Sequence, residues 1–121
     1  MVKRTGRHMP TFERGDIVRV PFPYTNRDTT QYRPALVVSS GTIASGMLLW
    51  VLMITSSANR SWPGDVSIVS GSNLTGLPAA SMIRTVKIAT IEAAVAQRIG
   101  SVSRDELDAV AHELSKLLPL R

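Results

Sequence analysis

The apolar run Pro34-Ala35-Leu36-Val37-Val38-Ser39-Ser40 is the clearest structural signal in this chain. No polar residue interrupts it from Ala35 to Val38, which is typical of a strand that is buried on both faces. A longer run of the same character follows at residues 48–55. Further strand candidates lie at residues 17–20, 65–69 and 81–90. At least five short strands with little helix between them predict a compact antiparallel sheet or a small barrel.

Residues that favour turns separate these strands. Pro21 and Pro23 should end the first strand, because proline cannot donate a hydrogen bond to a strand ladder. The polar segment 24–32 is predicted to be an exposed loop. Further connectors are expected at residues 41–46, 58–64 and 70–78.

The clearest helix is the last element of the chain. Ser103 and Glu106 have the spacing of a capping box, in which each side chain accepts a hydrogen bond from the other residue's backbone N–H. The apolar residues that follow share one helical face, and Pro119 should stop the helix. This face is expected to pack on the sheet; its residues are Leu107, Val110, Ala111, Leu114, Leu117 and Leu118.

Length and composition indicate one globular domain. The chain has 121 residues, 44% of them hydrophobic and 19% charged. We expect a flexible basic arm at residues 1–12 and a single domain over 13–121. The chain has no cysteine, and its most apolar run is far shorter than the roughly 20 residues that cross a membrane. A cytoplasmic location is therefore the simplest expectation.

The net charge of +5 is unevenly distributed. Residues 1–98 contain 11 Lys and Arg against 5 Asp and Glu, a balance of +6, whereas residues 99–121 contain 3 against 4, a balance of −1. A basic body suits a polyanionic partner such as nucleic acid, because each phosphate contact releases counterions. The alternative is that the charge serves solubility alone.

The chain lacks the residues and motifs that most common classes of enzyme need. A metal site needs clustered ligands, but the chain has only His8 and His112, and its nine carboxylates have no ligand-like spacing. Glycine-rich phosphate loops, the nucleophile elbow and the zincin motif are also missing. We therefore expect neither a metal nor a cofactor.

Arginines and hydroxyl residues at strand ends remain as candidate functional groups. An arginine can bind phosphate bidentately, and RNA supplies its own nucleophile, the 2′-hydroxyl. A ribonuclease needs to hold the backbone in line, stabilise charge and help protons move. Each residue also has a structural interpretation, as a solvated charge or as the end of a strand. The candidates are Arg33, Arg60, Arg84, Thr55, Ser56 and Ser57.

Four ordered blocks of this chain resemble the MazF/PemK toxin family of toxin-antitoxin systems. The resemblance covers about residues 13–118, including the segment 99–103 that leads into the last helix. The blocks are Gly15-Asp16-Ile17-Val18-Arg19-Val20-Pro21-Phe22-Pro23-Tyr24-Thr25, Tyr32-Arg33-Pro34-Ala35-Leu36-Val37-Val38-Ser39, Met53-Ile54-Thr55-Ser56 and Lys87-Ile88-Ala89-Thr90-Ile91.

The resemblance implies a fold, an activity and partners. It implies an SH3-like small barrel with a C-terminal helix, and a homodimer that cleaves single-stranded RNA in a groove at its interface. The products would carry a 2′,3′-cyclic phosphate and a 5′-hydroxyl, and the cleavage would inhibit translation and growth. A cognate antitoxin would lay a disordered segment over the same groove. The family's catalytic residues fall on Arg33, Thr55 and Arg84.

The chain departs from the family pattern at two points that concern proton transfer. Many relatives have an aspartate two residues after the arginine at position 84, where this chain has Val86. The loop 24–32 lacks the histidine that some members place there. Because arginine is a poor general base, we assign Arg33 to phosphate binding and charge stabilisation and keep Asp28 as a candidate base.

The RNA contacts are expected in the loops and at strand ends. Trp62 is a candidate for stacking on a base or, equally, for packing in the fold. The expected RNA-binding residues are Tyr24, Arg27, Asp28, Ser56, Ser57, Arg60, Trp62 and Lys87.

Two other functions remain open. A toxin of the same fold can act without catalysis by binding a protein, as the gyrase-poisoning CcdB toxins do. Their C-terminal aromatic grip is absent here, because the chain ends Leu117-Leu118-Pro119-Leu120-Arg121. The third possibility is an inactive relative that still binds RNA or an antitoxin.

Overall fold

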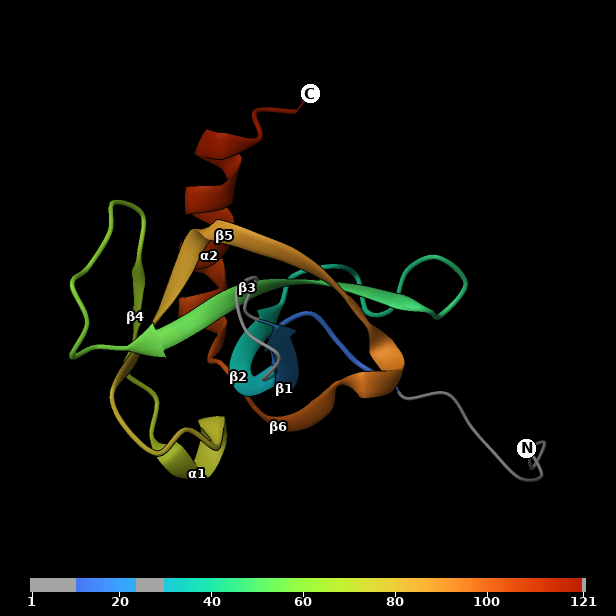
Figure 1. Ribbon diagram of the computed structural model, residues 1–121. Helices are drawn as coiled ribbons and strands as arrows, with labels where there is room; N and C mark the ends of the chain where they lie inside the picture. The colour runs from blue at the N-terminus through green and yellow to red at the C-terminus, as the bar shows by residue number, and fades with distance from the viewer. Residues whose placement is uncertain (1–10, 24–29, 121) are drawn as a thin grey trace.

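The computed structural model describes residues 11–23 and 30–120, which form one curled antiparallel sheet and a long C-terminal helix (Figure 1). The strands follow the order β4-β5-β3-β2-β1-β6 across the sheet. This half-barrel confirms the predicted small barrel with a C-terminal helix. The elements are β1 (Asp16–Pro23), β2 (Thr30–Val37), β3 (Leu48–Ser56), β4 (Val66–Ile68), α1 (Ser72–Thr75), β5 (Ser81–Glu92), a 3₁₀ turn (Ala93–Val95), β6 (Gln97–Ser101) and α2 (Arg104–Leu117).

The sheet buries apolar side chains on both of its faces. Ala35, Leu36 and Val37 of β2 are all fully buried, as the uninterrupted apolar run predicted. Neighbouring residues belong to different clusters: Ala35 and Val37 pack inside the curl of the sheet, whereas Leu36 packs on the outer face. Val110 of α2 belongs to the outer cluster, so the helix covers that face. Burial on both faces explains why no polar residue interrupts the run.

The first strand is longer than the prolines predicted. β1 pairs with β2 from Ile17 to Pro23, so Pro21 and Pro23 do not end the ladder. β1 pairs with its other neighbour, β6, only as far as Arg19. Beyond Arg19 one side of β1 has no partner strand among the described residues, and there a missing N–H breaks no ladder hydrogen bond.

Two elements were not expected from the sequence, and one loop is shorter than expected. The strand β6 and the four-residue helix α1 lie within segments that showed no clear periodicity. β2 already begins at Thr30, inside the segment predicted as a loop to residue 32. Residues 24–29 of that loop, and residues 1–10 of the predicted N-terminal arm, lie outside the described residues. Phe12 packs in the inner core, so ordered packing includes the last residue assigned to the arm.

The capping box at the start of α2 is confirmed, and it does more than cap the helix. The Ser103 hydroxyl accepts a hydrogen bond from the Glu106 N–H, and the Glu106 carboxylate accepts one from the Ser103 N–H. The same buried carboxylate also accepts hydrogen bonds from the N–H groups of Val69 and Ser70 and from the Ser70 hydroxyl. Glu106 therefore ties α2 to the segment that follows β4.

Only part of the predicted apolar face of α2 packs on the sheet. Val110 is buried and Leu114 is partly buried against the outer cluster. Leu117 and Leu118 are about half exposed, because the helix extends beyond the edge of the sheet (Figure 1). Within the part of the chain that the structure describes, no helix is long and apolar enough to span a membrane.

Gly100 of β6 packs closely against the backbone of α1, and a substitution can test this contact. A Cβ atom at this position would overlap the backbone carbonyl group of Thr75 in α1. We expect Gly100→Ala to lower the free energy of unfolding by about 3 kcal/mol, since backbone atoms cannot give way as a flexible side chain can. Urea unfolding measures the effect, and Gly71→Ala is the control because its Cβ would approach only the end of the Asn73 side chain. Equal stability of the two variants would contradict this account of the α1–β6 contact.

Candidate active site

The register between β2 and β3 brings Arg33 close to Thr55. Ala35 pairs with Met53 in this ladder. Arg33 lies two residues before Ala35, and Thr55 lies two residues after Met53. Because side chains two residues apart in a strand point to the same face, Arg33 and Thr55 project from one face of the sheet. Both side chains line the same small hollow.

A bulge in β5 adds two more cationic residues to this hollow. Ile54 of β3 pairs with Ile83 of β5, and Leu52 pairs with Ile88. Only Met53 lies between the two β3 residues, whereas residues 84–87 lie between the two β5 residues. The extra length of β5 must bend out of the ladder at this point. The bend directs both Arg84 and Lys87, three positions apart, to the hollow.

The hollow is small and strongly basic. Its volume is about 70 Å³, which suits a phosphate group and is far below the several hundred Å³ of a site that encloses a whole ligand. No carboxylate is among the described residues that line it, so it favours an anion. The lining residues are Arg33, Met53, Ile54, Thr55, Arg84 and Lys87.

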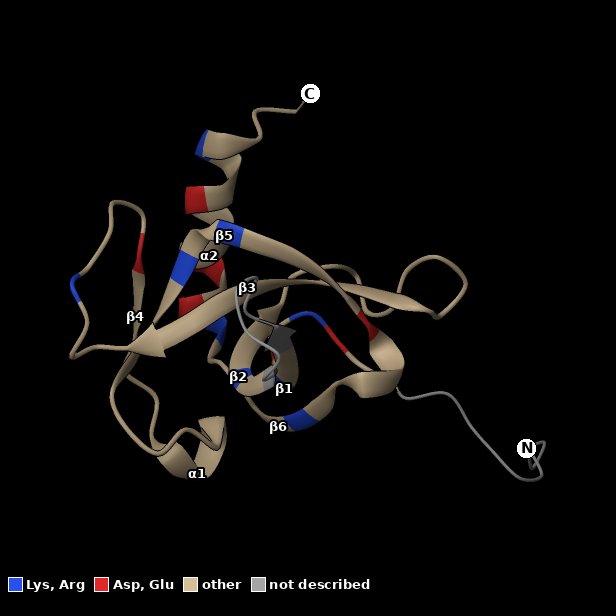
Figure 2. Ribbon diagram, in the orientation of Figure 1, with Lys and Arg blue, Asp and Glu red and all other residues tan. Residues whose placement is uncertain are grey.

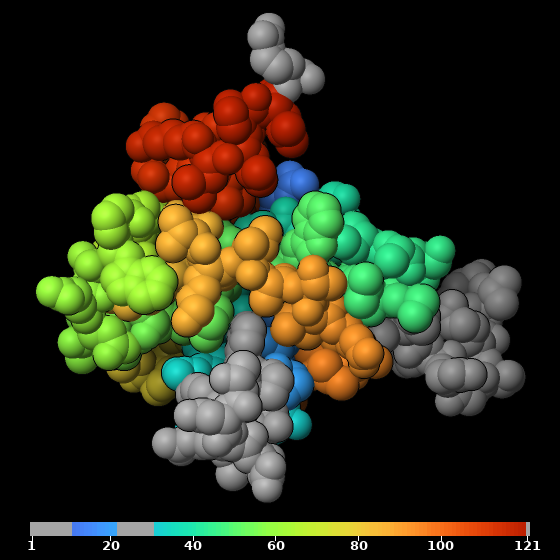
Figure 3. Space-filling model, turned by 45° about the horizontal axis from the view of Figure 1, so that its top comes forward, coloured from blue at the N-terminus to red at the C-terminus, as the bar shows by residue number. Residues whose placement is uncertain are grey.

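The figures show β5, which supplies Arg84 and Lys87, at the surface of the molecule. Figure 2 shows basic positions on β5 and on the loop that leads into β4. In the space-filling view, β5 crosses the visible face between this loop and α2 (Figure 3). A polyanionic chain can therefore approach β5 on this face.

The Thr55 side chain is oriented by the turn that follows β3. The Asn59 side-chain amide donates a hydrogen bond to Thr55 Oγ1 at 2.6 Å. Since the oxygen accepts this bond, the hydroxyl proton can be donated to another acceptor. Ser56 and Ser57 build the same turn: the Ser56 hydroxyl accepts a hydrogen bond from the Ala58 N–H, and the Ser57 N–H donates to the Ala80 carbonyl.

Arg84 is buried and held on several sides. Its Nη1 lies 3.1 Å from Asp65 Oδ2, and its Nη2 donates a hydrogen bond to the Arg60 carbonyl at 2.9 Å. The guanidinium carbon lies 3.8 Å from the centroid of the Trp62 ring, in a cation–π contact. The Arg84 guanidinium is therefore fixed at the edge of the hollow, and Arg60 contributes its backbone carbonyl to this arrangement.

The Trp62 side chain packs in the fold and is also partly exposed. It packs against Arg84, and Lys87 Nζ lies 5.6 Å from its ring centroid. At the same time, 39% of its surface is exposed. Its contact with Arg84 orients the ring, and its exposed part is available to a ligand.

The structure groups most of the residues that the sequence singled out. Arg33, Thr55, Arg84 and Lys87 line one hollow, and the turn with Ser56, Ser57, Arg60 and Trp62 borders it through the contacts described above. Tyr24, Arg27 and Asp28 lie outside the described residues. Val86 is a half-exposed apolar side chain.

Asp65 is the functional candidate that the sequence did not reveal. It appeared only as the first residue of a predicted strand, after the turn residues Pro63 and Gly64. Its ion pair with Arg84 joins residues 19 positions apart, and nothing in the local sequence indicates such a contact. Among residues 11–23 and 30–120, no group of three or more His, Cys, Asp or Glu is placed to hold a metal ion.

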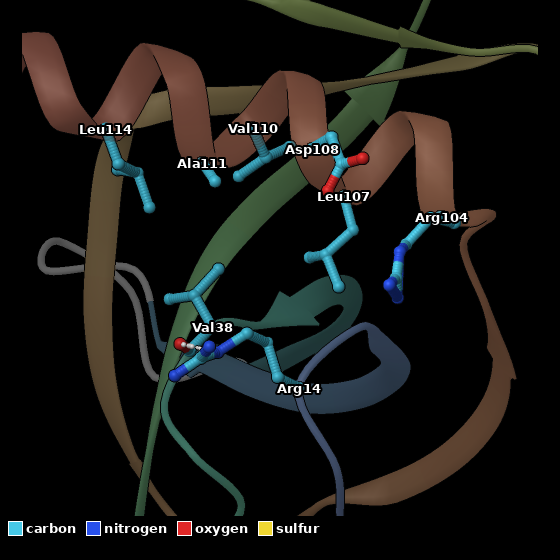
Figure 4. A pocket seen from close by; sticks show the side chains of 8 residues that line it. All are labelled: Arg14, Val38, Arg104, Leu107, Asp108, Val110, Ala111 and Leu114. Atoms are coloured by element: carbon cyan, nitrogen blue, oxygen red, sulfur yellow. Dashed lines mark hydrogen bonds between the residues drawn. The ribbon is translucent and has the colours of Figure 1, made fainter.

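A second and larger hollow lies under α2 (Figure 4). Its volume is about 390 Å³, and apolar side chains from α2 and Val38 face one another across it. Arg14 and Arg104 lie at its edge, and Arg14 donates a hydrogen bond to the Val38 carbonyl. It contains none of the predicted site residues, and its apolar walls do not favour a phosphate.

Comparison with known proteins identifies one family. The model of the PemK-like, MazF-like toxins of type II toxin-antitoxin systems matches residues 13–118. A structure of MazF from Deinococcus radiodurans superposes with a TM-score of 0.69 at 21% identity, covering 94% of this chain and 100% of that one. An endoribonuclease from a mycobacterial species, in complex with its cognate antitoxin, gives a TM-score of 0.67 at 18% identity and covers 90% and 96%. These structures share the fold. No curated protein sequence matches significantly.

Proposed function

Because this chain belongs to the PemK-like, MazF-like toxins of type II toxin-antitoxin systems, we propose that it is an endoribonuclease that cleaves single-stranded RNA at specific sequences without a metal ion. Cleavage of cellular RNA in the cytoplasm would inhibit translation and growth.

One observation carries this proposal: Arg33, Thr55, Arg84 and Lys87 line a single hollow of phosphate size. They come from three strands, and no described carboxylate lines the hollow with them. Three cationic side chains at one small space, one of them paired with Asp65 behind it, create a positive potential that attracts an anion. An RNA phosphate supplies that anion.

The proposed reaction needs no nucleophile from the protein. The 2′-oxygen of one nucleotide attacks the adjacent phosphorus, and the bond from phosphorus to the 5′-oxygen of the next nucleotide breaks. The 2′-hydroxyl loses its proton and the leaving 5′-oxygen gains one, so the products are a 2′,3′-cyclic phosphate and a 5′-hydroxyl. Negative charge builds up on the phosphate oxygens in the transition state, where preorganised donors stabilise it most.

The residues of the hollow take distinct parts in this reaction. Arg33 binds the phosphate and stabilises its developing charge, and the Thr55 hydroxyl donates a hydrogen bond to a phosphate oxygen. Arg84, held by Asp65 and Trp62, adds a second fixed guanidinium. Lys87 and the exposed parts of Ser56, Ser57, Arg60 and Trp62 contact the neighbouring nucleotides, together with Tyr24 and Arg27. Asp28 remains the candidate general base.

The proposal extends to partners. Solved structures of the same fold include complexes of MazE with MazF and of an endoribonuclease with its cognate antitoxin. We propose that this chain likewise has a cognate antitoxin, which competes with RNA for the basic surface around the hollow. We also propose a homodimer in which the RNA groove follows the subunit interface.

Metal removal is the direct test of this chemistry. Purified protein is incubated with a long single-stranded RNA in EDTA, and the fragments are sequenced. We expect discrete fragments at an unchanged rate, because no step uses a metal ion. Their 5′ ends should accept phosphate from polynucleotide kinase without prior dephosphorylation. Cleavage that requires added Mg²⁺ would contradict the mechanism, and growth arrest without RNA fragments would favour a protein target such as gyrase.

A further inference from the structure

We infer that Asp65 is a positioning residue of this active site, which fixes the Arg84 guanidinium beside Arg33 and Thr55. The inference rests on the proposed function and assigns a role to a residue outside the hollow. Asp65 touches Arg84 and acts on the RNA only through it.

Both partners of the ion pair are withdrawn from solvent. The Arg84 side chain is 8% exposed and the Asp65 side chain 5% exposed, with 3.1 Å between Nη1 and Oδ2. An arginine side chain has many rotamers, and fixing one of them costs conformational entropy. A buried carboxylate offsets that cost before the substrate arrives. The result is a guanidinium that is already oriented in the free enzyme.

Asp65 also fixes the loop that carries the other contacts of Arg84. Its Oδ2 accepts a hydrogen bond from the Trp62 N–H at 2.8 Å, and its own N–H donates to the Trp62 carbonyl. The Trp62 ring lies against one face of the guanidinium, and the Arg60 carbonyl accepts from Nη2. One carboxylate oxygen thus orients both the guanidinium and the ring that packs on it.

The turn before Asp65 is built to hold it against β5. Gly64 has a φ of +88°, and a Cβ at this position would approach Thr85 Oγ1 to 2.9 Å. The Thr85 hydroxyl donates a hydrogen bond to the Gly64 carbonyl at 2.8 Å. Since Thr85 follows Arg84 directly in β5, the turn is attached to the strand at the point where the arginine leaves it.

The other oxygen of Asp65 makes a precise experiment possible. Oδ1 is buried and has no hydrogen-bond partner among the described residues. Asp65→Asn can keep its oxygen at the position of Oδ2, with the bonds to Arg84 and Trp62, and place its amide where Oδ1 lies. The substitution thus removes the charge with little change of shape. Asp108→Asn is the matched control, because it removes the same charge at an exposed position on α2 that lies away from the hollow.

We expect Asp65→Asn to lower kcat for RNA cleavage about 10- to 100-fold while KM stays unchanged or falls. With a neutral hydrogen bond in place of the ion pair, Arg84 still attracts phosphate, but it is held less firmly in the orientation that the transition state needs. A residue that only stabilises the fold would lower the melting temperature and leave kcat of the folded protein and KM unchanged. The Asp108→Asn control should match the wild type in both constants.

A second measurement does not depend on cleavage. In ¹⁵N NMR spectra, a guanidinium held by an ion pair gives separate, slowly exchanging side-chain signals, which Arg84→Lys assigns by removing them. We expect Asp65→Asn to average these signals and Asp108→Asn to leave them intact. Unchanged signals, or an unchanged kcat in a cleaving enzyme, would overturn the inference. A wild type that cleaves no RNA defeats the proposed function and the catalytic role with it, while the spectra still decide whether Asp65 holds Arg84.

Discussion

Replacing Arg33 by Ala is expected to lower kcat for RNA cleavage by about 10²- to 10³-fold, the usual effect of removing one preorganised donor from a developing negative charge. Arg33 lines the hollow with Thr55 and the β5 cations, so its loss would remove one of the positive charges proposed to bind the phosphate. Cleavage of a defined single-stranded RNA measures the effect in vitro. In cells, expression of the wild type should arrest growth, and expression of the Arg33→Ala variant should not.

The control for this prediction is Arg104→Ala. Arg104 is an exposed arginine at the start of α2 and lies at the edge of the other hollow (Figure 4). The Arg104→Ala substitution removes the same charge from the protein, so its effect shows how much of the loss comes from general attraction to RNA. We expect it to lower kcat/KM only slightly and mainly at low salt. Equal toxicity of the wild type and Arg33→Ala would remove Arg33 from the mechanism.

Glu106→Ala is expected to cause the largest loss of stability, about 3 to 5 kcal/mol in the free energy of unfolding. The buried carboxylate accepts hydrogen bonds from the backbone N–H groups of Ser103, Val69 and Ser70, and each buried donor left without an acceptor costs about 1 to 3 kcal/mol. The substitution also removes half of the capping box of α2. Urea unfolding at neutral pH measures the loss.

The same residue makes a pH prediction with a defined sign. Burial by itself raises the pKa of Glu106, but the hydrogen bonds from Ser103, Val69 and Ser70 outweigh it and lower that pKa below its ordinary value of 4.5. A lowered pKa in the folded state means that the stabilisation is fully present above about pH 4.5 and is lost as the pH falls through the folded-state pKa.

Comparison with Glu106→Gln isolates this contribution from that of other carboxylates. The difference in unfolding free energy between the wild type and Glu106→Gln should be constant near neutral pH and shrink in acid. Glu113→Gln is the control, because Glu113 pairs with Lys116 on the surface of α2 and should contribute little at any pH. If this difference in unfolding free energy grows as the pH falls, the predicted direction of the pH dependence is wrong.

Local sequence signals predicted most of the fold. The apolar runs located β2 and β3, and the Ser103 to Glu106 spacing located the start of α2. Two wrong predictions, the early end of β1 and the missed strand β6, both concern contacts between strands that are distant in the sequence. The role of a proline in β1 depends on where the neighbouring strand β6 ends, and β6 itself is a short strand at the edge of the sheet with little periodicity.

The candidate site likewise contains residues that local motifs predicted and contacts that only the tertiary structure shows. Arg33 and Thr55 could be predicted because each lies in a short motif that resembles the family. Arg84 was predicted as a catalytic cation, but its partners were not. The cation–π contact with Trp62 and the ion pair with Asp65 join segments that only the packing of the β3–β4 loop against β5 brings together.

The sequence by itself determined that this chain is a small basic β-rich domain with a capped C-terminal helix, because composition, apolar periodicity and capping depend on residues close in the chain. Only the tertiary structure decided that residues 84–87 lie opposite the single residue Met53, so that Arg84 and Lys87 turn toward the same hollow as Arg33 and Thr55. It also decided that Asp65 stands beside the arginine. A bulge and a buried ion pair depend on strand register, which no stretch of neighbouring residues encodes.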